Sequence, residues 1–198
     1  MATAVGALLR ARGLDGRAAL LGHSMGGKTA MVLALDRPNA VARLIVVDIA
    51  PVAYGHGSVN AEIVAALQAL PLDRIASRRD ADAALAERIP DAMLRAYLLA
   101  NLERQGEGFM WRLNLAGLHR SLDALHGFPD FPADSRYDRP TLFLAGAKSD
   151  YIRERDWPVI RARFPGARLE TVPDAGHWVH AEAPDAVVAR ITAFMDAR

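Results

Sequence analysis

The pentapeptide GHSMG, from Gly22 to Gly26, matches the pattern G-x-S-x-G. In this pattern a serine occupies a strained turn between a strand and a helix, and its Oγ projects above the edge of a sheet. The apolar run 18–21 precedes the motif, and a proline-free, helix-compatible stretch follows it up to Asp36. We therefore predict that Ser24 is a nucleophile and that a Cβ at the flanking glycines would collide with neighbouring elements. The alternatives are a turn that only connects strand to helix and a phosphate-binding loop at the helix N-terminus.

A serine hydroxyl needs a base to take its proton. The loop after the last strand returns to the sheet beside such a turn, and the string TVPDAGHW there offers a strand end, a glycine turn and His177. The other histidines lack this context: His23, His56, His119, His126 and His180. A surface-loop role for His177 is one alternative. A metal pair with His180 is another, for which the sequence offers no third ligand.

The acid that orients the histidine has two candidates. Asp48 directly follows the apolar run 44–47, and Asp150 follows the later run 141–145. Asp150 could instead cap the helix after it, and Asp48 could turn the chain ahead of Pro51. A buried carboxylate needs strong hydrogen bonds, which a histidine N–H would supply, and we favour Asp48.

The elements that must position these residues follow from the apolar patterns. Helical spacing covers 4–10, 28–36, 153–163 and 184–195, and strand-like runs cover 18–21, 44–47, 141–145 and 168–172. Residues 55–139, between the runs 44–47 and 141–145, have helical periodicity at 59–70, 83–89 and 92–102 and no convincing strand. These patterns predict an α/β fold with a parallel sheet, whose ligands bind beyond the carboxyl ends of the strands. We divide the chain into a core with the serine turn at 1–54, a helical cap insertion at 55–139 and a core with His177 at 140–198.

Composition excludes several classes of protein. The 198 residues fit one globular domain with an insertion, and 24 Lys+Arg against 23 Asp+Glu argue against a nucleic-acid partner. The absence of cysteine excludes disulfides, Cys-ligated metals and a thiol nucleophile. The first residues resemble neither a secretory signal nor a membrane span, so we expect a cytoplasmic protein without a membrane partner.

Longer strings resemble a known family. The chain is similar to α/β-hydrolases, and within them to YbfF-type bacterial esterases and their ABHD11-like eukaryotic relatives, over residues 18–196. The strings that carry this resemblance are GHSMGGK at 22–28, VDIAPV at 47–52, WRLN at 111–114 and AGHWVHAE at 175–182.

The resemblance implies a serine hydrolase of carboxylic esters or acyl thioesters such as acyl-CoA, which uses no metal or organic cofactor. It implies a triad of Ser24, Asp48 and His177, with the N–H of Met25 as one oxyanion donor. The family typically has a serine after the later strand, which matches Ser149, while the neighbouring Asp150 keeps the other acid open. We expect the insertion to cover Ser24.

Side chains of the insertion are expected to cover Ser24, unless they pack only in the insertion's own core. They include Met93, Leu98, Phe109 and Trp111. Trp111 and Trp178 are our candidates for the walls of a substrate pocket, because an aromatic ring offers an apolar face to an acyl chain.

One departure concerns the start of the chain. Only 23 residues precede Ser24, and they lack the His-Gly loop that supplies the second oxyanion donor in these hydrolases. We therefore expect a truncated gene or a misplaced start codon, and weak activity from the 198-residue chain. The alternative function is an impaired hydrolase remnant or a binding module. A bare edge at 18–21 would also favour self-association.

Overall fold

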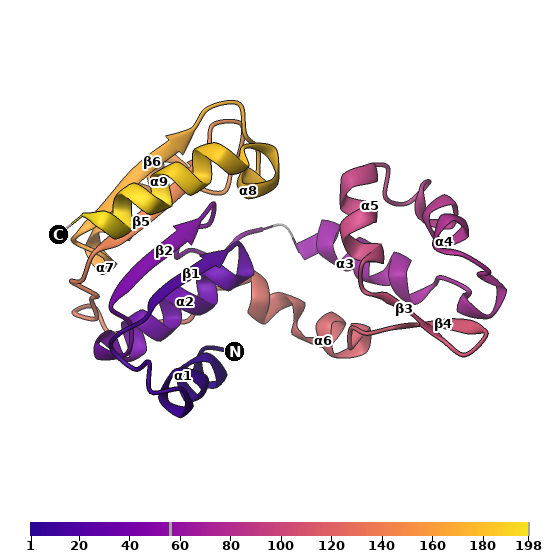
Figure 1. The fold of residues 1–198 in the computed structure, drawn as a ribbon, viewed down its shortest axis with the longest axis horizontal. Helices are drawn as coiled ribbons and strands as arrows, with labels where there is room; N and C mark the ends of the chain where they lie inside the picture. The colour runs from indigo at the N-terminus through magenta and orange to yellow at the C-terminus, as the bar shows by residue number, and fades with distance from the viewer. Residues whose placement is uncertain (56, 198) are drawn as a thin grey trace. The chain divides into compact units, whose positions relative to one another are not determined.

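The computed structural model describes residues 1–55 and 57–197 as two compact units (Figure 1). The first unit comprises Met1–Val52 and Phe128–Arg198, and the second comprises Ala53–Gly127. None of the helices in the described ranges has the length and apolar character needed to cross a membrane.

The first unit is built on a parallel sheet. Its strands are β1 (Ala19–His23), β2 (Arg43–Val47), β5 (Thr141–Gly146) and β6 (Ala167–Val172), in the order β1-β2-β5-β6. All three pairings are parallel, which confirms the predicted fold class. Every residue of β5 is buried, because both faces of this strand are covered.

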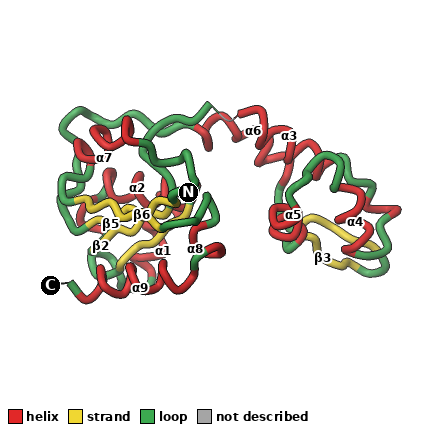
Figure 2. The backbone as a smooth tube through the Cα atoms, turned by 90° about the horizontal axis from the view of Figure 1, so that it is seen from above, coloured by secondary structure: helices red, strands yellow, loops and turns green. Residues whose placement is uncertain are grey.

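Helices cover the two faces of this sheet. The helices of the first unit are α1 (Ala2–Ala11), α2 (Met25–Asp36), α7 (Trp157–Arg163), α8 (Val179–Glu182) and α9 (Pro184–Asp196), with short 3-10 turns η1 (Pro38–Ala40) and η3 (Glu154–Asp156). Helices α2 and α7 lie on one side of the strands and α9 on the other (Figure 2). On the α9 side, Leu142 and Leu144 of β5 share a buried cluster with Val187 and Phe194. Phe143, one position along, contacts the ring of Phe164 at 5.8 Å instead.

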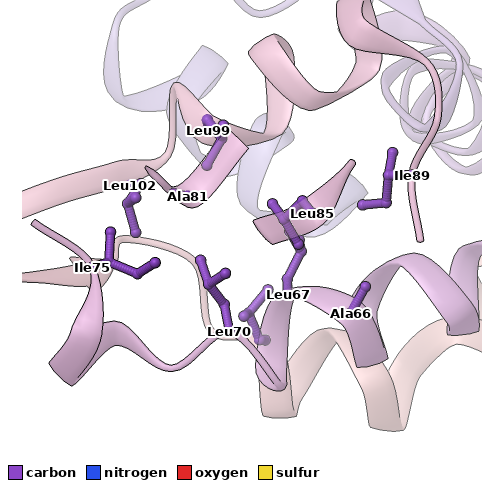
Figure 3. Packing of buried hydrophobic residues seen from close by; sticks show 10 residues of the cluster. Ala66, Leu67, Leu70, Ile75, Ala81, Leu85, Ile89, Leu99 and Leu102 are labelled. Carbon is purple, nitrogen blue, oxygen red and sulfur yellow. The ribbon is translucent and has the colours of Figure 1, made fainter. Parts of the chain in front are cut away.

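The second unit has a core of its own. Its elements are α3 (Gly57–Gln68), η2 (Leu72–Arg74), α4 (Arg78–Leu85), α5 (Ala92–Leu99), β3 (Leu102–Gln105), β4 (Gly108–Trp111) and α6 (Leu115–His126). Leu67, Leu85 and Leu102 are among the buried residues of this core (Figure 3). Ser77 and Asp91 accept main-chain N–H groups at the starts of α4 and α5, so that both helices are capped.

An antiparallel hairpin in this unit corrects the sequence analysis, which predicted no strand there and a helix up to residue 102. Helix α5 ends at Leu99, and Leu102 pairs with Trp111 in the two-stranded sheet of β3 and β4. The turn falls at Gly106 and Glu107, and Gly106 has φ +60°, a conformation that glycine adopts without strain. The apolar residues at 98, 99 and 102 have the spacing of a helix, although helix α5 ends at Leu99.

Residues 128–139, which the sequence analysis assigned to the insertion, group with the first unit. The buried hydroxyl of Tyr137 donates to the carbonyl of Val41 at 3.0 Å. The guanidinium of Arg163 donates to the carbonyls of Phe131 and Ser135. These bonds hold an irregular, proline-rich segment against the sheet unit.

Candidate active site

Ser24 occupies a one-residue turn between β1 and α2. Its backbone angles are φ 52° and ψ −120°, a region that non-glycine residues rarely adopt and that costs about 1–3 kcal/mol. Its N–H donates to the carbonyl of Val47, which ties the turn to the end of β2. A Cβ at Gly22 would lie 2.3 Å from the Gly26 carbonyl group, so glycine is required there. Gly26 faces open space among the described residues, and the predicted collision was wrong at that position.

The stretch from Gly22 to Thr29, GHSMGGKT, also fits the phosphate-loop pattern G-x-x-x-x-G-K-[ST], so the sequence pattern alone does not separate the two readings. The backbone geometry separates a serine turn from a phosphate loop. A phosphate loop needs several non-helical residues whose N–H groups surround the phosphate. Here α2 begins at Met25, so only Ser24 lies between strand and helix, and Lys28 is buried with 8% of its surface exposed. The turn therefore presents a side chain and forms no cradle.

Three of the predicted residues form a continuous hydrogen-bonded row. The Nε2 atom of His177 lies 3.1 Å from Ser24 Oγ, and its Nδ1 lies 2.8 Å from Asp48 Oδ2. Asp48 is completely buried, and its other oxygen accepts the N–H of Gly146 at 3.0 Å. The hydroxyl of Ser149 also donates to Asp48 Oδ2. An acid that accepts from the imidazole on one side, and an imidazole that reaches a hydroxyl on the other, is the arrangement that activates a serine.

Asp150, the alternative acid, lies outside this row. Its side chain is 82% exposed and pairs with Arg153 at 3.4 Å. The main-chain carbonyl of Asp150 accepts from the same guanidinium at 3.0 Å. Asp150 therefore closes a local turn ahead of η3, while its neighbour Ser149 faces Asp48.

Aromatic rings surround the imidazole of His177. The ring of Tyr151 stacks on it with centroids 3.9 Å apart, and the His23 ring lies 4.7 Å away. Trp178 is half-buried and contacts both histidine rings. Burial and, to a smaller extent, the Asp48 carboxylate raise the pKa of the Tyr151 phenol, so the stacked ring is neutral at physiological pH. Sequence reasoning did not single out Tyr151, because no motif marks it.

The loop that carries His177 approaches the sheet closely. A Cβ at Gly146 would lie 2.2 Å from the carbonyl oxygen of Gly176, so only glycine lets this loop lie against the end of β5. The carboxylate of Glu182 accepts the N–H groups of Gly176 and Trp178, on either side of His177. The approach of Gly146 to Gly176 joins segments 30 residues apart, and the sequence offers no local signal for it.

Met25 lies at the start of α2, where the first N–H groups have no acceptor within the helix. Its predicted role as an oxyanion donor stays a prediction. Beside it, an apolar groove of about 410 Å³ follows the outer side of β1, where Leu21 is 49% exposed and no described strand pairs. The groove is lined by Met1, Ala4, Val5, Leu20, Leu21, Met25, Gly26, Thr29 and Ala30. Self-association along this edge likewise stays a prediction.

The two tryptophans predicted as pocket walls differ in their surroundings. Trp178 belongs to the ring cluster beside His177. Trp111 packs against the core of the second unit, as do Leu98 and Phe109, and its indole N–H donates to the carbonyl of Leu67 at 3.1 Å. Met93 is 53% exposed. Whether the second unit covers Ser24 stays a prediction.

The remaining histidines do not join the row. His119 and His126 belong to α6 of the second unit, and His180 contacts only the edge of the ring cluster. His56 lies outside the described residues. Within residues 1–55 and 57–197, no group of three or more acidic or histidine side chains could hold a metal ion.

Buried Lys28 predicts a pH-dependent stability. Burial lowers its pKa to about 8 from an ordinary value of 10.5. Below about pH 8 both states bind the proton and the full penalty of burying the charge is present. Between about pH 8 and 10.5 the unfolded chain binds more protons than the folded chain, so the free energy of unfolding gains up to about 3 kcal/mol as pH rises.

Urea denaturation of the parental chain and of a Lys28→Met variant checks this sign. The parental chain should gain stability relative to the variant from pH 7.5 to 10.5. Parallel pH profiles for the two proteins would show that Lys28 has an ordinary pKa.

Comparisons with known proteins show the family to which this chain belongs. Residues 1–184 match a family described as having the alpha/beta hydrolase fold. A zebrafish (Danio rerio) protein named sn-1-specific diacylglycerol lipase ABHD11 is 42% identical over 184 residues, which cover 91% of this chain and 57% of the relative. Esterase YbfF from Escherichia coli K12 is 35% identical, over 91% of this chain and 68% of the relative.

A solved structure, described as a marine microorganism esterase, superposes with a TM-score of 0.92 at 33% identity. The match covers 98% of this chain and 75% of that one. The chain thus spans somewhat more than half of the length of the ABHD11 relatives it matches. Family match, identity and superposition agree with the parallel sheet flanked by helices, and they establish that this chain belongs to the α/β-hydrolase family.

Proposed function

We propose that the chain is a serine hydrolase of carboxylic esters and that Ser24, His177 and Asp48 are its catalytic residues. The observation that carries this proposal is the row of hydrogen bonds from Ser24 Oγ through the His177 imidazole to the buried Asp48. Further support comes from relatives that are named esterases and a lipase. We propose oxygen esters as the main substrate class. Acyl thioesters are the second class, because the same chemistry cleaves them.

In the proposed mechanism Ser24 Oγ attacks the carbonyl carbon while its proton passes to His177 Nε2. Asp48 holds the Nδ1 proton and stabilises the imidazolium that forms. The substrate oxygen becomes negative, and the N–H of Met25 donates to it. The tetrahedral intermediate collapses, His177 protonates the leaving alcohol or thiol, and an acyl-serine remains. Water, deprotonated by His177, then attacks the acyl-serine and releases the carboxylic acid and free Ser24.

Labelling with a fluorophosphonate probe tests this proposal, because the probe reacts with an activated serine without needing a particular substrate. We expect one adduct, located at Ser24 by peptide mass spectrometry, and its loss in a His177→Ala variant. Rates with p-nitrophenyl and acyl-CoA substrates of equal chain length then separate oxygen esters from thioesters. A folded chain that does not label would contradict the proposal and favour a binding module.

The tryptophan walls give a prediction on substrate preference. If Trp178 and Trp111 line the acyl pocket, replacement of either by alanine should change the ratio of kcat/KM for hexanoate and acetate esters by about tenfold. Trp157 is the matched control, because this third tryptophan lies in α7 with Arg161 over its ring. A Trp111→Ala variant that loses only stability, with an unchanged ratio, would assign Trp111 to the core of the second unit alone.

A further inference from the structure

His23 is the last residue of β1 and directly precedes Ser24. Its Nε2 atom is 2.8 Å from the main-chain carbonyl oxygen of His177. A carbonyl oxygen only accepts, so the imidazole of His23 must donate through an N–H at Nε2. The two histidines lie 154 positions apart in the chain, and this bond joins the serine turn to the loop that carries the base.

Three aromatic rings lie close to the imidazole of His23. Its ring is half-buried, 4.7 Å from the His177 ring, 5.7 Å from Trp178 and 4.8 Å from His180. Burial is the largest influence on His23 and lowers its pKa, so the neutral ring with its proton on Nε2 is the form present at neutral pH. A neutral donor fixes the loop without placing a positive charge beside the base.

The main chain of His177 is held on both sides of its carbonyl as well. Glu182 accepts the N–H of Gly176 at 2.8 Å and that of Trp178 at 3.1 Å. Glu182 is exposed, so water competes for these bonds, whereas the bond from His23 is part-buried. A hydrogen bond shielded from water is weakened less by competition with solvent, so the bond from His23 is a restraint that water disturbs less.

We propose that His23 is a positioning residue that holds the main chain of His177 so that its Nε2 stays within reach of Ser24 Oγ. The inference rests on the proposed function, in which His177 is the base. The distance of 3.1 Å between His177 Nε2 and Ser24 Oγ is close to the upper limit of about 3.2 Å for proton transfer to a base. Small displacements of the loop would therefore break the contact, and a misplacement of about 1 Å can reduce a rate about a hundredfold.

Three variants test the role in steady-state kinetics. His23→Ala removes the donor and should lower kcat about tenfold or more with little change in KM. His23→Gln should recover most of this loss, because its amide N–H lies the same number of bonds from the main chain. His180→Ala is the matched control, which removes an exposed ring of the same cluster and should retain the parental kcat. A rise in KM alone, or no recovery in His23→Gln, would overturn the proposal.

One further measurement separates positioning from a general effect on folding. The downfield proton NMR signal of the His177–Asp48 hydrogen bond should shift or broaden in His23→Ala and remain in His23→Gln. This NMR signal can be observed without turnover. A chain that does not react with the fluorophosphonate probe would refute the proposed hydrolase, and the NMR result would still decide the role of His23.

Discussion

A Ser24→Ala variant should lose about six orders of magnitude in kcat, measured on an activated ester with a preparation that hydrolyses it. The reason is that nucleophile and base act as a unit, so removal of either leaves only substrate binding and oxyanion stabilisation. Among the described residues the side chain makes one hydrogen bond, to His177 Nε2. We therefore expect the circular dichroism spectrum of the variant to match that of the parental chain.

A Ser24→Gly variant provides the control for backbone strain. Glycine adopts the observed φ of 52° without a steric penalty, whereas alanine keeps that penalty. The glycine variant should be as inactive as the alanine variant yet exceed it by about 1 kcal/mol in the free energy of unfolding. Hydrolysis at the parental rate by either variant would refute the assignment of the nucleophile.

The sequence predicted the sheet unit well because its signals are local. The apolar runs of the two central strands, β2 and β5, are buried and stand out from the helices between them. The serine turn is equally local, since Gly22 and Ser24 mark it within three residues. His177 was predicted because it follows a strand end and a glycine turn, and parallel strands bring all such loops to one edge of the sheet.

The missed features depend on contacts between distant segments. The hairpin of β3 and β4 has only four residues in each strand, too few for alternation to outweigh the helical spacing before it. Residues 128–139 join the sheet unit through Tyr137 and Arg163, which no composition signal reveals. The bond from His23 to the carbonyl of His177 leaves no trace in the sequence either, because the acceptor is main chain.

The choice between the two acids illustrates the same limit. Asp48 and Asp150 both follow strands of the sheet, so position alone leaves either able to reach His177. What separates them is burial and hydrogen bonding: Asp48 accepts the Gly146 N–H and the Ser149 hydroxyl in addition to the imidazole. Only the three-dimensional arrangement shows that these donors converge on one carboxylate.

Asp48→Asn is expected to lower kcat by about four orders of magnitude, because only a carboxylate at this position fixes the tautomer of His177. The asparagine oxygen can still accept from Gly146, which turns its NH2 group toward the imidazole and the Ser149 hydroxyl. The imidazole must then accept at Nδ1 and carry its proton on Nε2. A protonated Nε2 faces Ser24 as a donor and cannot take the proton of the serine.

Asp150→Asn is the matched control for this prediction, since it makes the same chemical change four residues after the end of β5. Its carboxylate is 82% exposed and pairs with Arg153 on the surface, an interaction worth at most about 1 kcal/mol. We expect kcat within about twofold of the parental value. A crippled Asp150→Asn together with an active Asp48→Asn would reverse the assignment. It would require the loop after β5 to rearrange during turnover so that Asp150 replaces Ser149 beside His177.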